Sequence, residues 1–229
     1  MLTIDFWYEF ASTYSYPAAM RIEALAAGQG VAVRWRPFLL GPLFADQGWR
    51  DSPFNLFPVK GRYMWRDMER ICAALGLPLK RPDPFPQNTL LAARTAQALP
   101  EPARPAFSRT IYAAEFGEGR PISERGAIAQ ALADCGHDAA SVLAQAESPD
   151  GKAALKAAVE DARAGPAGRA LRRHARRRGV LGQRPAGDGG GMDGAGRRSK
   201  SRHDVPVVRP SGVRRASHWT LPCSACLNA

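Results

Sequence analysis

Residues 4–17 read IDFWYEFASTYSYP, and the expected architecture of the whole chain depends on this stretch. Residues 2–10 are dense in β-branched and aromatic side chains, which favour a half-buried strand. Small and hydroxyl residues then interrupt the run, and from Pro17 onward apolar residues recur at helical spacing. The stretch therefore predicts a buried strand that passes through a short turn into a helix, with Ser12 at or just before the helix N-terminus.

The predicted position of Ser12 suits an anion or a thiol that must ionise. Unpaired backbone N–H groups and the positive end of the helix dipole meet at a helix N-terminus, and a serine hydroxyl adds one more donor. The alternative is that Ser12 only caps the helix or forms the turn. Because the motif contains no histidine base, we do not expect Ser12 to act as an acyl-enzyme nucleophile.

The rest of the first 162 residues predicts one more strand and then mostly helices. Residues 31–35 (VAVRW) alternate and indicate a second strand, parallel to the first and ended by Pro37. Residues 38–58 are rich in Pro, Gly and aromatics, which indicates an ordered loop that lines a site. The spacing predicts a helix from Val59 with its stop at Gly76, a helix capped by Asn88 or Thr89, and further helices over 105–162.

Several segments, taken in order, carry a resemblance to a known family. DFWYEFASTYSYPA resembles the opening of 2-hydroxychromene-2-carboxylate isomerases and of the similar kappa-class glutathione transferases. RPFLLGPLF, SPFNLFPVKGRYMWRDMERICAALGLPL, PDPFPQNTLLAAR and AEFGEGR resemble later segments of that family. The resemblance covers about residues 1–162. It implies an α/β thioredoxin-like fold of the disulfide-oxidoreductase type with an inserted helical domain, and a serine in place of the first redox cysteine.

This resemblance also implies a domain division and a function. The division is a β-α-β unit over residues 1–40, a helical insertion over 41–162 and a basic, Gly/Arg-rich tail over 163–229. The implied activity is a glutathione-dependent isomerisation of 2-hydroxychromene-2-carboxylate to trans-o-hydroxybenzylidenepyruvate in aromatic, naphthalene-type catabolism. A kappa-type glutathione transferase or peroxidase is the alternative on the same fold. The implied partners are a small aromatic substrate and a second copy of the chain in a homodimer.

Five residues are the candidate site. Ser12 is expected to hold the glutathione thiolate and to be catalytic, and Asn55 to bond the glutathione backbone unless it is only a turn residue. Lys60 would pair with a glutathione carboxylate, although a lysine at a helix start is often simply solvated. Asn88 would face the substrate, or else cap a helix. Arg36 would meet the substrate carboxylate, with packing or salt bridging as its alternative.

After Arg163 the chain changes character. Eleven of the 22 glycines fall in the last 67 residues, with almost no apolar periodicity, which is typical of a disordered basic tail. Reading residues 168–193 one nucleotide out of register permits GAPFVVTPDGEVFWGNDRLE, which resembles the family's C-terminal signature. We therefore hypothesise a frame shift near residues 165–166, in the gene or its sequencing. The C-terminal strands and helix would then be missing, and a true shift in the gene would put the activity of this chain in doubt.

The net charge of +11 belongs to that tail. Residues 1–162 hold 17 Lys and Arg against 18 Asp and Glu, whereas residues 163–229 hold 15 against 3. Mixed signs over the first part are typical of a globular domain, so we expect no nucleic-acid partner. The competing hypothesis is a non-enzymatic protein whose basic tail binds nucleic acid.

Composition also bears on the compartment. No run approaches eighteen apolar residues and the N-terminus lacks a basic region, so we expect no membrane span, no secretory signal and a cytoplasmic location. Cys72 and Cys135 are expected to be buried free thiols of a reducing compartment. Cys223 and Cys226 form a single CxxC motif, which is weak evidence for zinc or redox chemistry, and we expect no metal.

Overall fold

A computed structural model describes residues 2–165 of the chain. The hypothesised frame shift, the Cys223–Cys226 motif and nearly all of the predicted basic tail lie outside the described residues. Residues 163 and 164, which the sequence assigned to the tail, form the last turn of a helix.

The N-terminal β-α-β unit is present as predicted. Strand β1 (Leu2–Tyr8) is followed by helix α1 (Ser15–Ala27) and strand β2 (Val31–Pro37). The two strands pair in parallel, with Phe6 opposite Trp35, and they are the only strands in the described part of the chain. β1 ends two residues before the predicted Phe10, and α1 begins two residues before the predicted Pro17.

Aromatic side chains hold this unit together. The ring centroids of Phe6 and Tyr8 lie 5.0 and 5.2 Å from that of Trp35, in edge-to-face geometry. Tyr8 also donates or accepts a 2.7 Å hydrogen bond with the hydroxyl of Ser108, which lies a hundred residues away. Edge-to-face ring pairs add to the free energy gained from burying the rings. The strand pair is thereby fixed against the helical part of the chain.

Helices make up the rest of the described chain. The loop predicted over 38–58 contains two short helices, so that part of the prediction was wrong; the helices predicted after it are present. In chain order the elements are α2 (Leu40–Ala45), α3 (Pro53–Leu56), α4 (Pro58–Leu75), α5 (Leu90–Ala98), η1 (Glu101–Ala103), α6 (Arg104–Tyr112), the π-helical turn η2 (Ala113–Gly117), α7 (Arg125–Asp134), α8 (Ala139–Glu147) and α9 (Pro149–Ala164).

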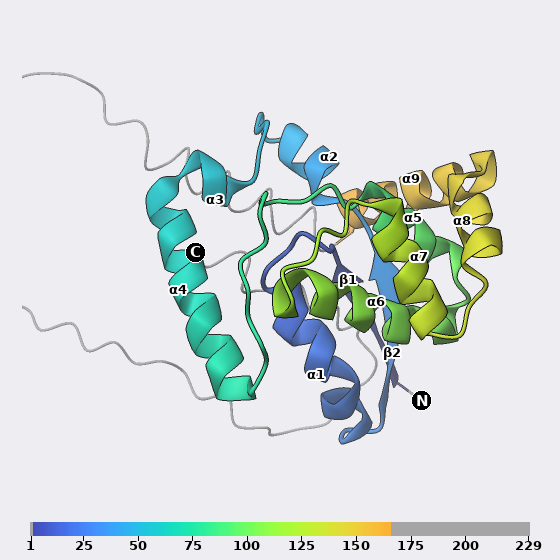
Figure 1. Cartoon of the computed structure of the whole chain (residues 1–229), viewed down its shortest axis with the longest axis horizontal. Helices are drawn as coiled ribbons and strands as arrows, with labels where there is room; N and C mark the ends of the chain where they lie inside the picture. The colour runs from blue at the N-terminus through green and yellow to red at the C-terminus, as the bar shows by residue number, and fades with distance from the viewer. Residues whose placement is uncertain (1, 166–229) are drawn as a thin grey trace, which may run out of the picture.

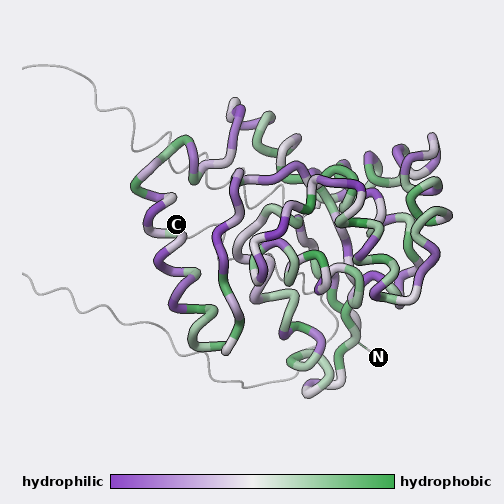
Figure 2. Tube along the Cα trace, in the orientation of Figure 1, coloured by the Kyte–Doolittle hydropathy of each residue, from purple (hydrophilic) through white to green (hydrophobic). Residues whose placement is uncertain are grey.

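The helices lie on two sides of the strands. Figure 1 shows α5 to α9 gathered on one side, whereas α4 stands on the other with the connector 77–89 running beside it. Along α4, hydrophilic and hydrophobic residues alternate (Figure 2), because only one face is covered. Met64, Met68 and Cys72, spaced four residues apart, form that buried face. The helix ends as predicted at Gly76, whose φ of 65° is the left-handed conformation that glycine adopts most easily.

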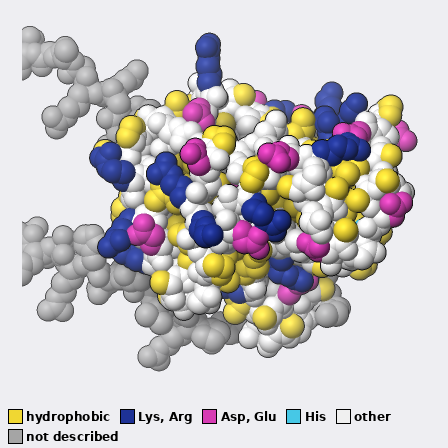
Figure 3. Space-filling model, in the orientation of Figure 1, with side chains coloured by type: hydrophobic (Ala, Val, Ile, Leu, Met, Phe, Trp, Pro, Cys, Tyr) yellow, Lys and Arg dark blue, Asp and Glu magenta, His cyan; other side chains and the backbone are white. Residues whose placement is uncertain are grey.

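The described surface is mixed in charge. Figure 3 shows basic and acidic side chains interspersed over the visible face. Cys72 and Cys135 are free thiols, as predicted, although only Cys72 is fully buried. Within residues 2–165, none of the helices combines the length and the apolar composition needed to cross a bilayer.

A close backbone approach at Gly61 gives the first prediction. A Cβ at this position would overlap the carbonyl oxygen of Phe54 and lie 3.3 Å from its carbonyl carbon. We expect Gly61→Ala to push α3 away from α4 and to lower the free energy of unfolding by about 2 kcal/mol. The control is Gly126→Ala in α7, where a Cβ meets nothing within 4 Å. This substitution should raise the free energy of unfolding by up to about 1 kcal/mol. Urea denaturation measures both, and equal effects would contradict the proposed overlap.

Candidate functional site

A cavity of about 710 Å³ opens beside the C-terminal end of β1. Four segments enclose it: the turn after β1, the stretch from Leu39 to Phe54, the start of α4 and the end of the connector before α5. The sequence predicted that the Pro- and aromatic-rich stretch lines a site, and it does line this cavity. Its apolar wall contains Leu39, Leu40, Pro42, Phe44, Trp49 and Phe54.

Ser12 lies on this wall, in the turn that leads from β1 to α1. The side chain is 7% exposed, and the backbone N–H of Ser12 donates to the Glu9 carbonyl over 3.1 Å. Ser12 does not cap the helix: α1 begins three residues later, at Ser15, and its N-cap residue is Tyr14, which makes no side-chain cap bond. The helix-cap half of the alternative is therefore wrong for Ser12, whereas Ser12 does form part of the turn, as the other half stated.

The turn itself uses part of the donor set expected at the helix terminus. The N–H of Ser15 donates to the Ser12 carbonyl, and the N–H of Tyr16 donates to the Thr13 carbonyl. These two N–H groups therefore point back into the turn. The Tyr14 hydroxyl donates to Asp67 of α4 over 2.9 Å, which fixes the turn against that helix.

Glu9 is the second polar group on the wall near Ser12. The side chain is 6% exposed, and its carboxylate accepts a hydrogen bond from the Thr89 hydroxyl. Burial raises the pKa of Glu9 from its ordinary 4.5 to about 7, and the Thr89 hydrogen bond opposes this rise. Glu9 therefore changes its charge near neutral pH.

Behind Glu9 lies a second buried carboxyl group, Glu115 of η2. It is fully buried, and neither of its carboxyl oxygens has a hydrogen-bond partner among the described residues. Burial raises the pKa of Glu115 well above its ordinary value, and the nearby Glu9 raises it further. The Tyr112 hydroxyl donates to the Glu9 carbonyl over 2.9 Å and so connects this helical region to the turn.

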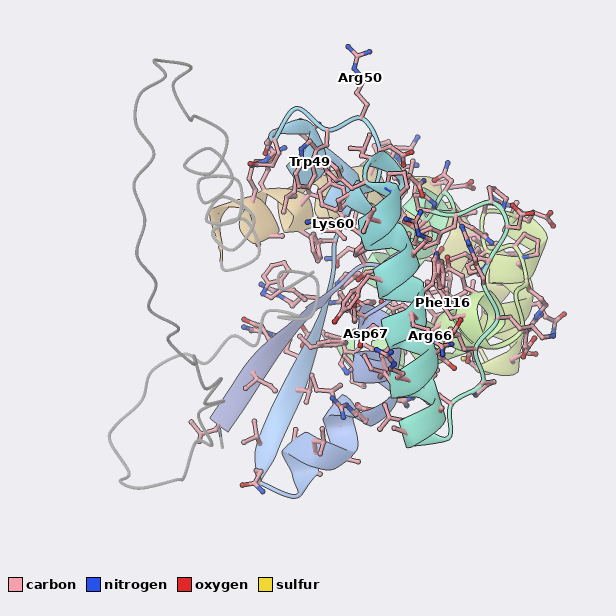
Figure 4. All side chains as sticks on the ribbon, turned by 90° about the vertical axis from the view of Figure 1, so that its left-hand side faces the viewer. Trp49, Arg50, Lys60, Arg66, Asp67 and Phe116 are labelled. Atoms are coloured by element: carbon pink, nitrogen blue, oxygen red, sulfur yellow. The ribbon has the colours of Figure 1, made fainter. Side chains whose placement is uncertain are left out.

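Two cationic side chains also line the cavity. Figure 4 shows Lys60 at the N-terminal end of α4 and Trp49 in the segment between α2 and α3, whereas Arg50 extends away from the body of the protein. The Lys60 ammonium lies 5.8 Å from the ring centroid of Phe57. Lys60 lines the same cavity as Ser12, and its predicted pairing with a glutathione carboxylate stays a prediction.

The other three predicted residues differ in their position relative to the cavity. Asn88 lines the cavity, but its Oδ1 accepts a 3.0 Å hydrogen bond from the N–H of Leu90, so it also caps α5. Asn55 is exposed outside the described wall, and its amide donates to both Asp51 oxygens and to the Phe85 carbonyl. Asn55 thus ties the α2–α3 segment to the connector.

Arg36 lies on β2 and does not line the cavity. Its guanidinium lies 3.8 Å from Asp5 and 4.0 Å from Asp161, and 5.1 Å from the ring centroid of Trp7. These contacts fit the salt-bridging alternative. The predicted roles of Arg36 toward substrate and of Asn55 toward glutathione stay predictions.

Comparison with known proteins identifies the family of the chain. Residues 3–166 match the DSBA-like thioredoxin domain. The chain belongs to this family. A related protein, the glutathione S-transferase kappa 1 of Caenorhabditis elegans, is 32% identical over 83 residues, 36% of this chain and 36% of that protein. The 2-hydroxychromene-2-carboxylate isomerase of Sphingobium xenophagum is 28% identical over 151 residues, 66% of this chain and 76% of that protein.

Solved structures confirm the DSBA-like fold. A 2-hydroxychromene-2-carboxylate isomerase superposes with a TM-score of 0.64 at 22% identity, over 70% of this chain and 79% of that one. A probable DsbA oxidoreductase from Streptomyces coelicolor superposes with a TM-score of 0.58 at 20% identity, over 71% and 75%. The predicted thioredoxin-like fold and family are thus confirmed. Relatives of this DSBA-like chain include an isomerase and a glutathione transferase.

Sequence reasoning missed the buried acids of this DSBA-like site. In the sequence, Glu9 stands out only as a charged residue among aromatic ones at the end of a strand. Thr89 was considered only as a helix cap, and Glu115 gave no signal because it is brought to Glu9 by the fold. A serine hydroxyl and a carboxyl group that titrates near pH 7 on one apolar wall can bind an anion and exchange a proton.

Proposed function

We propose that the chain is a glutathione-dependent isomerase that converts 2-hydroxychromene-2-carboxylate to trans-o-hydroxybenzylidenepyruvate in aromatic catabolism. The observation that carries the proposal is Ser12 on the wall of an apolar cavity large enough for a small aromatic molecule beside a thiol. The related isomerase, aligned over two thirds of the chain, supports the reaction class.

The residues present fit glutathione. A serine hydroxyl can donate to a thiolate, and Lys60 and Asn88 offer an ammonium and an amide for carboxylate and peptide groups. When bound, glutathione would supply a thiolate that adds reversibly to the conjugated substrate, so that a bond of the opened ring can rotate. Ser12 stabilises the sulfur anion, and Leu40, Phe44 and Phe54 exclude water from the aromatic ring.

The test is conversion of the hydroxychromene carboxylate by the full chain, followed by ultraviolet absorbance with and without glutathione. We expect conversion only when glutathione is present. Conversion at the same rate without glutathione, or no conversion with it, would overturn the proposal.

A kappa-type glutathione transferase is the second candidate, favoured by the 32% identity to the nematode transferase over 83 residues. Both candidates use the same serine and the same cavity. An activated aryl chloride distinguishes them: conjugate formation without isomerisation would assign the transferase.

Lys60 gives a prediction on binding. We expect Lys60→Gln to weaken glutathione binding about tenfold, because a hydrogen bond to a charged group contributes about 1.5 kcal/mol. The matched control is Arg66→Gln on the same helix, whose exposed guanidinium pairs with Glu69 outside the cavity wall. Isothermal titration calorimetry measures both dissociation constants. If the two variants bind equally well, Lys60 does not contact the ligand.

A further inference from the structure

The proposed function requires a group that accepts the proton of the glutathione thiol. A thiol that becomes a thiolate in this apolar cavity must give its proton to some group, and a serine hydroxyl can donate to the anion but is a poor base. Among the described lining residues, the carboxyl groups are those of Glu9 and Asp51. Asp51 is exposed, and its oxygens accept hydrogen bonds from Ser52 and Asn55.

Glu9 is placed to take this proton. The turn that brings the Ser12 N–H to the Glu9 carbonyl puts both residues on the same cavity wall. The Thr89 hydroxyl donates to the Glu9 carboxylate and orients it. We propose that Glu9 accepts the proton of the glutathione thiol inside the cavity, so that one negative charge passes from Glu9 to the sulfur. This inference rests on the proposed function.

The transfer is balanced within the site. The S–H bond breaks, an O–H bond forms on Glu9, and the charge of the site does not change. The reverse transfer restores both groups when the thiol re-forms. Proton transfer is efficient when donor and acceptor have similar pKa values. Burial brings the pKa of Glu9 to about 7, and donation from Ser12 lowers that of the thiol toward it.

We assign the role of proton acceptor to Glu9 rather than to the titratable groups around it. Glu115 of η2 faces it, and burial together with the nearby Glu9 raises the pKa of Glu115 well above its ordinary value, which favours its protonated form. Tyr112 of α6 has a pKa well above its ordinary value because of burial, so it stays neutral. The remaining charged groups of the described wall are Arg50, Asp51 and Lys60.

The decisive quantity is the number of protons released to buffer per thiolate formed when glutathione binds the full chain at pH 8. Thiolate is measured by ultraviolet absorbance, and proton release by calorimetry in buffers of different ionisation enthalpy. We expect a ratio well below one for the wild type: Glu9 is largely ionised at pH 8 before glutathione binds, and the thiolate formed beside it raises its pKa further, so that Glu9 retains the proton. In Glu9→Gln, thiolate should form at least tenfold more slowly in stopped-flow absorbance, because the local proton acceptor is lost, and each thiolate that forms should release one proton to buffer.

Glu115→Gln is the matched control, because glutamine imitates the protonated acid. It should keep the low ratio of the wild type. A ratio of one in the wild type, or an unchanged ratio and rate of thiolate formation in Glu9→Gln, would overturn the role of Glu9 while leaving the proposed function intact. Absence of glutathione binding would overturn both.

Discussion

Replacing Ser12 by alanine should lower kcat/KM for glutathione-dependent isomerisation roughly 100-fold, the loss typical of removing one donor from a developing anion. Ser12 is the hydroxyl of the turn that lines the cavity, and its removal leaves the sulfur anion without that donor. The pKa of the bound thiol should therefore rise. Steady-state kinetics give the first effect, and a pH titration of thiolate absorbance gives the second.

Ser15→Ala separates this role from a structural one. Ser15 is buried in the first turn of α1, does not line the cavity, and hydrogen-bonds with Tyr112. We expect it to change stability but to leave the thiol titration in place. If Ser12→Ala and Ser15→Ala reduce kcat/KM equally, the effect of Ser12 comes from the fold rather than from contact with the sulfur.

The sequence predicted the parts of the fold whose signals are local. The run of aromatic and β-branched residues before Ser12 predicted β1. Gly76 predicted the end of α4, because the ease with which glycine adopts the left-handed conformation does not depend on tertiary contacts. By contrast, α2 and α3 are six and four residues long, too short to show a helical period. The local signs of α3 were Ser52, whose side chain accepts the Phe54 N–H, and Pro53 at the first helical position.

The site residues, too, were predictable only where their signals are local. Ser12 and Lys60 were found because their neighbours in sequence form recognisable motifs, and both line the cavity. Asn55 looked equally suitable, yet its amide bonds the Phe85 carbonyl thirty residues away, a contact that no local pattern reveals. Glu115 lies 106 positions after Glu9, so the coupling of the two acids depends wholly on tertiary packing.

The second large effect concerns stability and pH. In the unfolded chain Glu9 should titrate near its ordinary pKa of 4.5, whereas in the folded protein the pKa is about 7. Between these values the folded protein keeps a proton that the unfolded chain has lost. Stability is therefore greatest below pH 4.5 as far as Glu9 is concerned, and it falls as pH rises to 7. The total loss is about 3 kcal/mol, since one pKa unit corresponds to about 1.4 kcal/mol.

Glu9→Gln should remove this loss, because a carboxamide stays neutral and can still bond Thr89. We expect the variant to be more stable than the wild type by about 3 kcal/mol at pH 8, and close to it at pH 4. Urea denaturation at the two pH values measures this difference. The control is Glu118→Gln, an exposed glutamate on the surface, which should change stability by less than about 0.5 kcal/mol at both.

Equal stability of Glu9→Gln and wild type at pH 8 would mean that the buried carboxylate is fully compensated in the folded protein, contrary to its raised pKa. A gain confined to high pH would mean that the chain keeps an ionisable group where a neutral one would make the fold more stable. Such a group is typical of a site where activity needs the charge. The same substitution should then stabilise the protein and slow thiolate formation, a combination that simple damage to the fold cannot produce.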